Sequence, residues 1–184
     1  MYELKIVITG CVGAGKSTAI SAISDIPVIS TEVDASDEVA KEKKTTTVAM
    51  DYGEVTLEDG QIIKIYGTPG QKRFAYMWEI LAEGALGIII LLNDKRPDPV
   101  GDMDMYLENF NEQIRQSVAV IGVTHAEDDA EGVAMSKYYD YLSERGLNHP
   151  VFSVDARDKM QMRLMLETMA AIIGSEEMLD GRVD

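Results

Sequence analysis

The sequence predicts an α/β fold: a mainly parallel six-stranded sheet with one antiparallel edge strand and helices on both faces. Three observations indicate this class. Short apolar runs typical of buried strands alternate with segments of helical periodicity along the 184 residues. A glycine-rich turn joins the first run to the first helical segment, as in folds that bind phosphate at a helix N-terminus. Two later runs meet at Asp59-Gly60, a pair that favours a tight hairpin and therefore antiparallel strands.

The first half of the chain contains the predicted hairpin. Residues 3–9 form an apolar run, which predicts a buried strand, and residues 15–24 continue from the glycine-rich turn as a helix. Residues 30–47 are polar, with few large apolar side chains, and are expected to form a mobile loop. The hairpin strands are then expected at 48–57 and 62–66.

The second half predicts the centre of the sheet and its helices. Residues 84–93 and 117–124 are almost continuously apolar, as in parallel strands buried on both faces, and 151–154 gives a short last strand. A final helix at 158–173 carries apolar residues at helical spacing. The other helices are expected at 72–83, 102–116 and 130–145.

Composition limits the function classes. The length and 46% apolar content predict one globular domain, residues 1–174, followed by an acidic flexible tail at 175–184. The net charge of −15 argues against nucleic acid and anionic membrane surfaces as partners. The sequence shows no signal peptide, membrane span or lipidation motif, so no membrane anchor is expected. The single cysteine fits a reducing, cytoplasmic location.

The glycine-rich turn is a complete phosphate-loop motif, GxxxxGK[ST], at residues 10–17. Its backbone N–H groups can surround phosphate oxygens at the positive end of the helix, which predicts a phosphate-loop nucleoside triphosphatase. Lys16 is expected to reach the terminal phosphates, and the Ser17 hydroxyl to ligate Mg²⁺. Cys11, inside the loop, is either a small filling side chain or an oxidisable thiol. The nucleotide-binding residues predicted here are Gly10, Val12, Gly13, Ala14, Gly15, Lys16, Ser17 and Thr18.

Two further segments identify a more specific resemblance. The polar stretch ends in Thr45-Thr46-Thr47, directly before the second predicted strand, and the third strand continues into Thr68-Pro69-Gly70-Gln71. With the phosphate loop, these segments make the chain resemble the Ras-like small GTPases along its whole length. Residues 44–53 and 66–74 look like the bacterial branch related to gliding-motility (Mgl-type) GTPases and to GTPases encoded beside sensor kinases and roadblock-domain proteins.

The resemblance implies roles for individual residues. Thr47, or Thr46 next to it, matches the threonine that ligates Mg²⁺ and contacts the γ-phosphate. Gly70 matches the glycine whose N–H contacts the γ-phosphate, and Gln71 matches the glutamine that orients the attacking water. Lys16, Thr47 and Gln71 would therefore be the catalytic set, and Ser17 and Thr47 the metal ligands. Arg73 is either an arginine finger or, more simply, a surface arginine.

Three departures from the family pattern stand out. Gly67 occupies the place of the aspartate that holds a metal-bound water. The guanine-reading tetrad is read as Thr124-His125-Ala126-Glu127, with Asp128 as the alternative to Glu127. Residues 155–157 replace the usual Ser-Ala-Lys segment, so Asp155, Ala156 and Arg157 are expected at the base. Residues 93–96 resemble part of a tetrad but follow the wrong strand, and we expect them to form a solvated loop.

The expected function is a cytoplasmic small GTPase that binds GTP and GDP with Mg²⁺ and hydrolyses GTP slowly. Two alternatives stay open: a nucleotide-binding scaffold with little or no hydrolysis, and an ATP-dependent kinase. The resemblance implies a roadblock-fold regulator, and switching implies an effector. Both are expected to bind at residues 45–50 and 71–78, which should order around the γ-phosphate.

Overall fold

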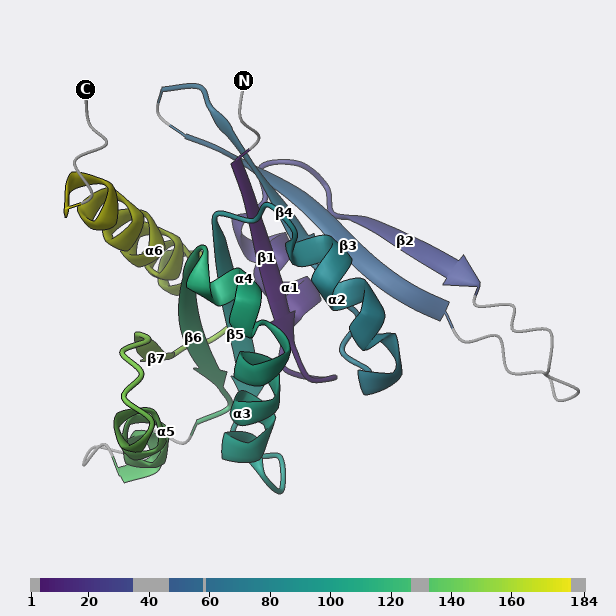
Figure 1. Cartoon of the computed structure of the whole chain (residues 1–184). Coiled ribbons are helices and arrows are strands. Elements are labelled where there is room, and N and C mark those ends of the chain that lie inside the picture. The colour runs from purple at the N-terminus through teal and green to yellow at the C-terminus, as the bar shows by residue number, and fades with distance from the viewer. Residues whose placement is uncertain (1–3, 35–46, 58, 127–132, 180–184) are drawn as a thin grey trace, which may run out of the picture.

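The computed structural model describes residues 4–34, 47–57, 59–126 and 133–179. One seven-stranded sheet forms its centre, in the order β2-β3-β4-β1-β5-β6-β7 (Figure 1). The strands are β1 (Leu4–Gly10), β2 (Ile29–Asp34), β3 (Thr47–Thr56), β4 (Ile62–Gly67), β5 (Gly87–Asn93), β6 (Val118–Thr124) and β7 (Val151–Ser153). The helices are α1 (Lys16–Ile23), the 3₁₀ turn η1 (Lys72–Phe74), α2 (Ala75–Ala82), α3 (Pro99–Asn109), α4 (Asn111–Arg115), α5 (Val133–Glu144) and α6 (Lys159–Leu179).

The predicted fold class is confirmed, with one strand more than expected. β3 is antiparallel to β2 and to β4, and the remaining pairs of neighbours are parallel. β2 lies at the start of the stretch 30–47 that was expected to be a loop, which makes seven strands rather than six. In sequence, Ile29, Thr31 and Val33 alternate with polar residues, the pattern of an edge strand. Because β2 pairs with the outer side of β3, the antiparallel strand is second from the edge. Residues 35–46 lie outside the described residues.

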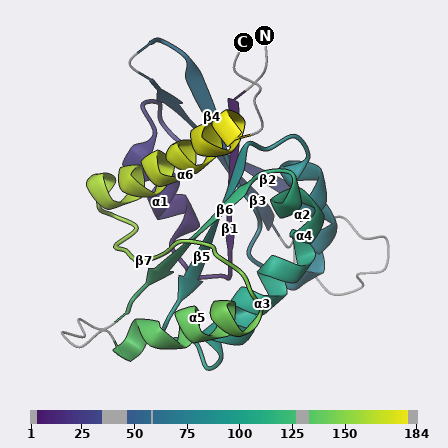
Figure 2. The same ribbon diagram turned by 60° about the vertical axis from the view of Figure 1, so that its left-hand side comes forward.

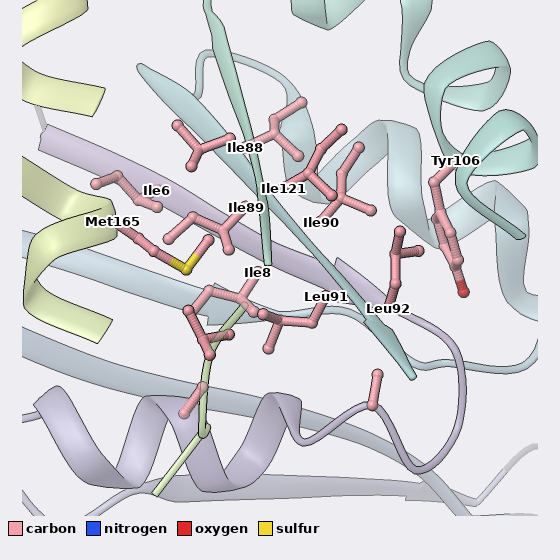
Figure 3. Packing of buried hydrophobic residues seen from close by; sticks show 14 of the residues in the cluster. Ile6, Ile8, Ile88, Ile89, Ile90, Leu91, Leu92, Tyr106, Ile121 and Met165 are labelled. Atoms are coloured by element: carbon pink, nitrogen blue, oxygen red, sulfur yellow. The ribbon is translucent and has the colours of Figure 1, made fainter. Parts of the chain in front are cut away.

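Helices cover both faces of the sheet (Figure 2). α1 and α6 pack against each other on one face, while α2 and α3 contact β1 and β5 from the other. The five residues Ile88 to Leu92 of β5 are fully buried, which confirms the expectation of a central strand. Figure 3 shows them packed with Ile8 of β1, Met165 of α6 and Tyr106 of α3. The carboxyl ends of the parallel strands therefore meet at one edge of a rigid sheet.

The helix boundaries differ from prediction in two places. The helix expected at 102–116 begins earlier, at Pro99, where the Asp98 side chain accepts a hydrogen bond from Gly101 N (2.9 Å), and it is interrupted at Phe110 to give α3 and α4. α6 continues to Leu179, so residues 175–179 extend a helix instead of belonging to the expected flexible tail. Residues 180–184 lie outside the described residues. Within the described part, no helix combines the length and the apolar character needed to cross a bilayer.

Candidate nucleotide site

The phosphate loop joins β1 to α1 in the arrangement that the motif predicts. Gly10, Gly13 and Gly15 have φ values of 144°, 79° and 94°, in a backbone region that residues other than glycine rarely adopt. A Cβ atom at Gly10 would overlap the carbonyl oxygen of Leu91 on β5. A Cβ atom at Gly15 would lie 2.8 Å from the Cβ of Ala156. The glycines therefore let the loop curl while it stays in contact with β5 and with the β7–α6 connection.

Lys16 is turned back onto its own loop. Its Nζ donates hydrogen bonds to the carbonyl oxygens of Gly10 (2.8 Å) and Cys11 (2.9 Å). Burial lowers the pKa of the Lys16 ammonium to about 8. Cys11 is 4% exposed, which favours the interpretation as a filling side chain. Of the other predicted loop residues, Val12 and Gly13 are exposed and Ala14 is fully buried.

Ser17, the first predicted metal ligand, donates a hydrogen bond to a buried carboxylate, Oδ2 of Asp51. The other carboxylate oxygen of Asp51 accepts a hydrogen bond from the Ser30 hydroxyl of β2 (2.6 Å). Asp51 is 6% exposed, and no ion pair within 4 Å joins it to a cationic side chain among the described residues. Within the described residues this buried carboxylate accepts hydrogen bonds from two hydroxyls, which compensate its charge incompletely, so the arrangement suits a bound cation.

Asp51 also supplies a carboxylate near Gly67, where the family pattern has an aspartate. The two residues are Cα partners across the β3–β4 pair. A Cβ atom at Gly67 would lie 2.8 Å from the Ile20 side chain and 3.2 Å from the Cβ of Asp51. The side chain that the family pattern has on β4 would therefore clash here, and a carboxylate reaches the same neighbourhood from β3. Asp51 was not predicted as a site residue, although the register of a hairpin centred on Asp59-Gly60 places it opposite Gly67.

The residues predicted to contact the γ-phosphate and the attacking water lie at the start of β3 and after β4. Thr47 is the first residue of β3 and pairs with Asp34; Thr45 and Thr46 lie outside the described residues. Gly70 lies against the phosphate loop, where a Cβ atom would be 2.7 Å from Lys16 Nζ. Gln71 is exposed and precedes η1. Arg73 is exposed, with its guanidinium 4.9 Å from the centre of the Phe74 ring, as expected for a surface arginine.

A cavity of about 650 Å³ lies beside the loop, at the ends of β6 and β7. Its walls come from the start of α1, from the residues after β6 and from the β7–α6 connection. Its lining brings together the following predicted residues: Gly15, Thr18, Thr124, His125, Asp155, Ala156 and Arg157. The size and mixed polar lining fit a nucleoside.

Polar contacts connect this cavity to the phosphate loop. The Thr124 hydroxyl lies within hydrogen-bond distance of the carbonyl oxygens of Ala14 (3.1 Å) and Leu92 (3.0 Å). His125 follows in a left-handed conformation (φ 58°), and its Nδ1 lies 3.0 Å from the Thr124 hydroxyl. Thr124 therefore fixes the position of the phosphate loop relative to this cavity. Glu127 and Asp128, between which the sequence left the reading of guanine open, lie outside the described residues.

The β7–α6 connection is held by an ion pair. Arg157 Nη2 lies 2.6 Å from Asp155 Oδ2, and hydrogen bonds from Arg157 hold the pKa of Asp155 at about 2. Asp155 N donates to Oε1 of Gln161 on α6 (2.8 Å). Ala156, between the paired residues, is 7% exposed. The charges of Asp155 and Arg157 neutralise each other, and Ala156 between them lines the cavity.

The segment 93–96, expected to be a solvated loop, is instead tied to the site and to the helices. Asn93 Nδ2 donates to the carbonyl oxygen of Gly13 in the phosphate loop (3.2 Å). Asp94 accepts a hydrogen bond from the Tyr138 hydroxyl (2.5 Å) and pairs with Lys137 (2.7 Å). Asn93 is thus a second residue that holds the phosphate loop, and its position at the end of a strand beside β1 was the available signal.

Comparison with known proteins identifies a family and several relatives. The model of a family described as "Conserved hypothetical ATP binding protein" matches residues 26–174, which begin after the phosphate loop. The uncharacterized protein MJ1339 of Methanocaldococcus jannaschii is 34% identical over 92 residues, 50% of this chain and 51% of that protein. Ras-related protein Rab-11B of Dictyostelium discoideum is 25% identical over 69% of this chain and 54% of its own length. Ras-related protein RABE1d of Arabidopsis thaliana is 25% identical over 92% of this chain and 81% of its own length. The chain spans about half the length of the first two relatives.

Among solved structures, the bacterial selenocysteine-specific elongation factor EF-Sec has a similar fold. The TM-score is 0.60 at 14% identity, over 93% of this chain and 29% of that one. At this identity the likeness concerns the fold alone.

Proposed function

The chain belongs to the family described as conserved hypothetical ATP binding proteins and has a GTPase-like fold, and on this basis we propose that it is a small GTP-binding protein that hydrolyses GTP slowly and switches between GTP and GDP states. The observation that carries the proposal is the hydrogen bond from Ser17, the exposed first-turn serine of the phosphate loop, to the buried carboxylate of Asp51. Hard oxygen donors of this kind suit Mg²⁺, the cation that accompanies nucleoside triphosphates.

Ser17 and Asp51 would have different roles at the ion: Ser17 would be a ligand, and Asp51 would orient it. The Ser17 hydroxyl donates its hydrogen bond to Asp51, which leaves the lone pairs of the hydroxyl oxygen free for Mg²⁺. The Ser30 hydroxyl fixes the orientation of the same carboxylate from β2. When bound, the ion would neutralise charge that develops on the β- and γ-phosphates during hydrolysis.

The other loop and switch residues supply positioning. Lys16 would exchange its two carbonyl partners for terminal phosphate oxygens. The N–H of Gly70 would donate to the γ-phosphate, and Gln71 would orient the attacking water. Thr47 would complete the metal site from the start of β3. Phosphoryl transfer needs little covalent help from the protein, so these roles suffice for slow turnover.

We propose guanine as the base. Ala156 lines the cavity, and its backbone N–H would bind a carbonyl acceptor such as guanine O6, whereas adenine offers an amino donor at that position. The similarity to Ras-related proteins also supports guanine. The printed family description favours ATP instead, so the base is the point that an experiment should decide first.

We also propose a protein partner at the switch segments, for which the Mgl-type resemblance suggests a roadblock-fold regulator. Tyr76 and Ile80 lie one helical turn apart on α2 and are 62% and 67% exposed. Exposed apolar side chains on the helix that follows Gln71 offer a surface that a nucleotide-dependent partner can recognise. Recovery of such a regulator from pull-downs in equal amounts with GTP and GDP would argue against this proposal.

The test is competition binding and phosphate release with GTP and ATP, each in Mg²⁺ and in EDTA. We expect Mg²⁺-dependent binding that favours GTP, with slow release of phosphate. Preference for ATP would replace the base assignment while keeping the nucleotide site. Tight GTP binding without phosphate release would support a non-hydrolysing scaffold. Failure of both nucleotides to bind would refute the proposal.

A further inference from the structure

Gly70 occupies space directly over the phosphate loop. A Cβ atom on Gly70 would lie 2.7 Å from Lys16 Nζ, 2.8 Å from the amide nitrogen of Val12 and 3.0 Å from the carbonyl carbon of Cys11. Lys16 and the loop amides are the groups that hold phosphate oxygens in this motif. In this conformation the backbone at Gly70 therefore stands beside the donors that a terminal phosphate would need.

The turn that carries Gly70 is anchored on its N-terminal side. Thr68 N donates to the carbonyl oxygen of Ile8 on β1 (3.0 Å), and the hydroxyls of Thr68 and Thr9 are 2.8 Å apart. Both threonines are buried. These contacts fix the point at which the chain leaves β4 and direct Pro69 and Gly70 toward the phosphate loop.

On its other side the turn is held by an indole. Trp78 Nε1 on α2 donates a buried hydrogen bond to the carbonyl oxygen of Pro69 (2.7 Å). Trp78 is 1% exposed, and its ring lies 4.9 Å from the ring of Tyr106 on α3 and 5.9 Å from that of Phe110, the residue after α3. α3 thus fixes the indole, and the indole fixes the carbonyl group next to Gly70.

We propose that Trp78 is a positioning residue that holds the Pro69–Gly70 turn over the phosphate loop and thereby disfavours the triphosphate relative to the diphosphate. A γ-phosphate needs the space beside Lys16 and the Val12 amide, so the turn would have to withdraw to the distance at which the Gly70 N–H can donate to that phosphate, whereas a diphosphate leaves this outer position free. The inference rests on the proposed nucleotide site and adds a residue outside the phosphate loop that sets its preference. Trp78 is also the single tryptophan of the chain, so its emission reports on the same contact.

The test compares Trp78→Phe with Tyr106→Phe in the full chain. Trp78→Phe keeps an aromatic ring and removes the donor to Pro69. Tyr106→Phe alters the same cluster but removes a buried hydroxyl that has no hydrogen-bond partner among the described residues. Competition against a fluorescent GDP analogue gives the affinities for GDP and for the slowly hydrolysed analogue GTPγS. We expect Trp78→Phe to shift the GTPγS-to-GDP affinity ratio toward GTPγS by about 2- to 12-fold, the worth of one hydrogen bond, and Tyr106→Phe to leave it unchanged.

Tryptophan emission of the unmodified protein provides a second readout that does not depend on a variant folding. GTPγS should change the emission because Pro69 leaves the indole, and GDP should not. An unchanged affinity ratio in Trp78→Phe, equal weakening of both nucleotides, or identical emission with GDP and GTPγS would each overturn the inference while leaving the nucleotide site intact. Failure of both nucleotides to bind would overturn the inference together with the proposed function.

Discussion

Replacing Asp51 by asparagine separates the metal site from the rest of the nucleotide site, because it removes a negative charge with almost no change in volume. Asp51 is 6% exposed and accepts hydrogen bonds from the hydroxyls of Ser17 and Ser30. The amide oxygen of asparagine can still accept one of these bonds. Unfolding of the unliganded variant should therefore require as much free energy as before, or more, because a buried carboxylate without an ion-pair partner in the described region is itself destabilising.

Binding of the metal should change in the opposite direction. Loss of a group that orients a metal ligand typically lowers metal affinity about 10- to 100-fold. At about 1.4 kcal/mol for each factor of ten, this corresponds to about 1.4–2.8 kcal/mol. The affinity of Asp51→Asn for GTP should fall by a similar factor in Mg²⁺ and stay unchanged in EDTA, since Lys16 and the loop amides are untouched.

The assay is a Mg²⁺ titration of each protein with a fluorescent GTP analogue, beside thermal unfolding without nucleotide. Asp59→Asn is the matched control: it removes the same charge in the hairpin turn, where Asn-Gly is as favourable as Asp-Gly. A loss of equal size in Mg²⁺ and EDTA would show that Asp51 supports the phosphate loop and not the ion. Unchanged affinity in Mg²⁺ would refute the reasoning altogether.

Three further predictions concern the phosphates, the water and the base. Burial lowers the pKa of Lys16 to about 8, and bound phosphate favours the charged amine, so nucleotide binding at pH 8 should take up about half a proton and should weaken above that pH. Calorimetry in buffers of different ionisation enthalpy measures the proton uptake. An absence of proton uptake at pH 8 would contradict the lowered pKa. Gln71→Leu should lower single-turnover hydrolysis while affinity stays nearly constant, and equal rates would assign the water to another group. Glu127→Ala should collapse the preference for GTP over ATP whereas Asp128→Ala should not, and the reverse result would shift the tetrad by one residue.

Local patterns predicted the fold and the phosphate loop because their signals lie within a few consecutive residues. The apolar runs of the parallel strands and the Gly10–Ser17 motif need no knowledge of distant partners. β2 was missed because its six residues are mostly polar and take their stability from pairing with β3. The break at Phe110 between α3 and α4 was missed because the pattern around it stays helical.

The parts of the site that escaped prediction depend on contacts between distant residues. Asn93 reaches Gly13 across 80 positions of sequence, and Asp51 reaches Ser17 across 34. Asp51 lies in the segment 44–53 and Asn93 in the segment 93–96, but neither sequence pattern indicates these contacts. The sequence showed that a carboxylate is missing at Gly67, but only the pairing of β3 with β4 shows which residue takes its place.

The pairing of Asp51 with Gly67 has a consequence for how such proteins are recognised in genomes. The two positions lie equally far from Asp59 at the hairpin turn, so a carboxylate on either strand can reach the same neighbourhood. A search that demands aspartate at the end of β4 would discard chains that carry this carboxylate on β3 instead. A search for a hairpin with aspartate on one strand and glycine at the mirrored position on the other would recover them, and would sort the recovered chains by strand pairing instead of by linear motif.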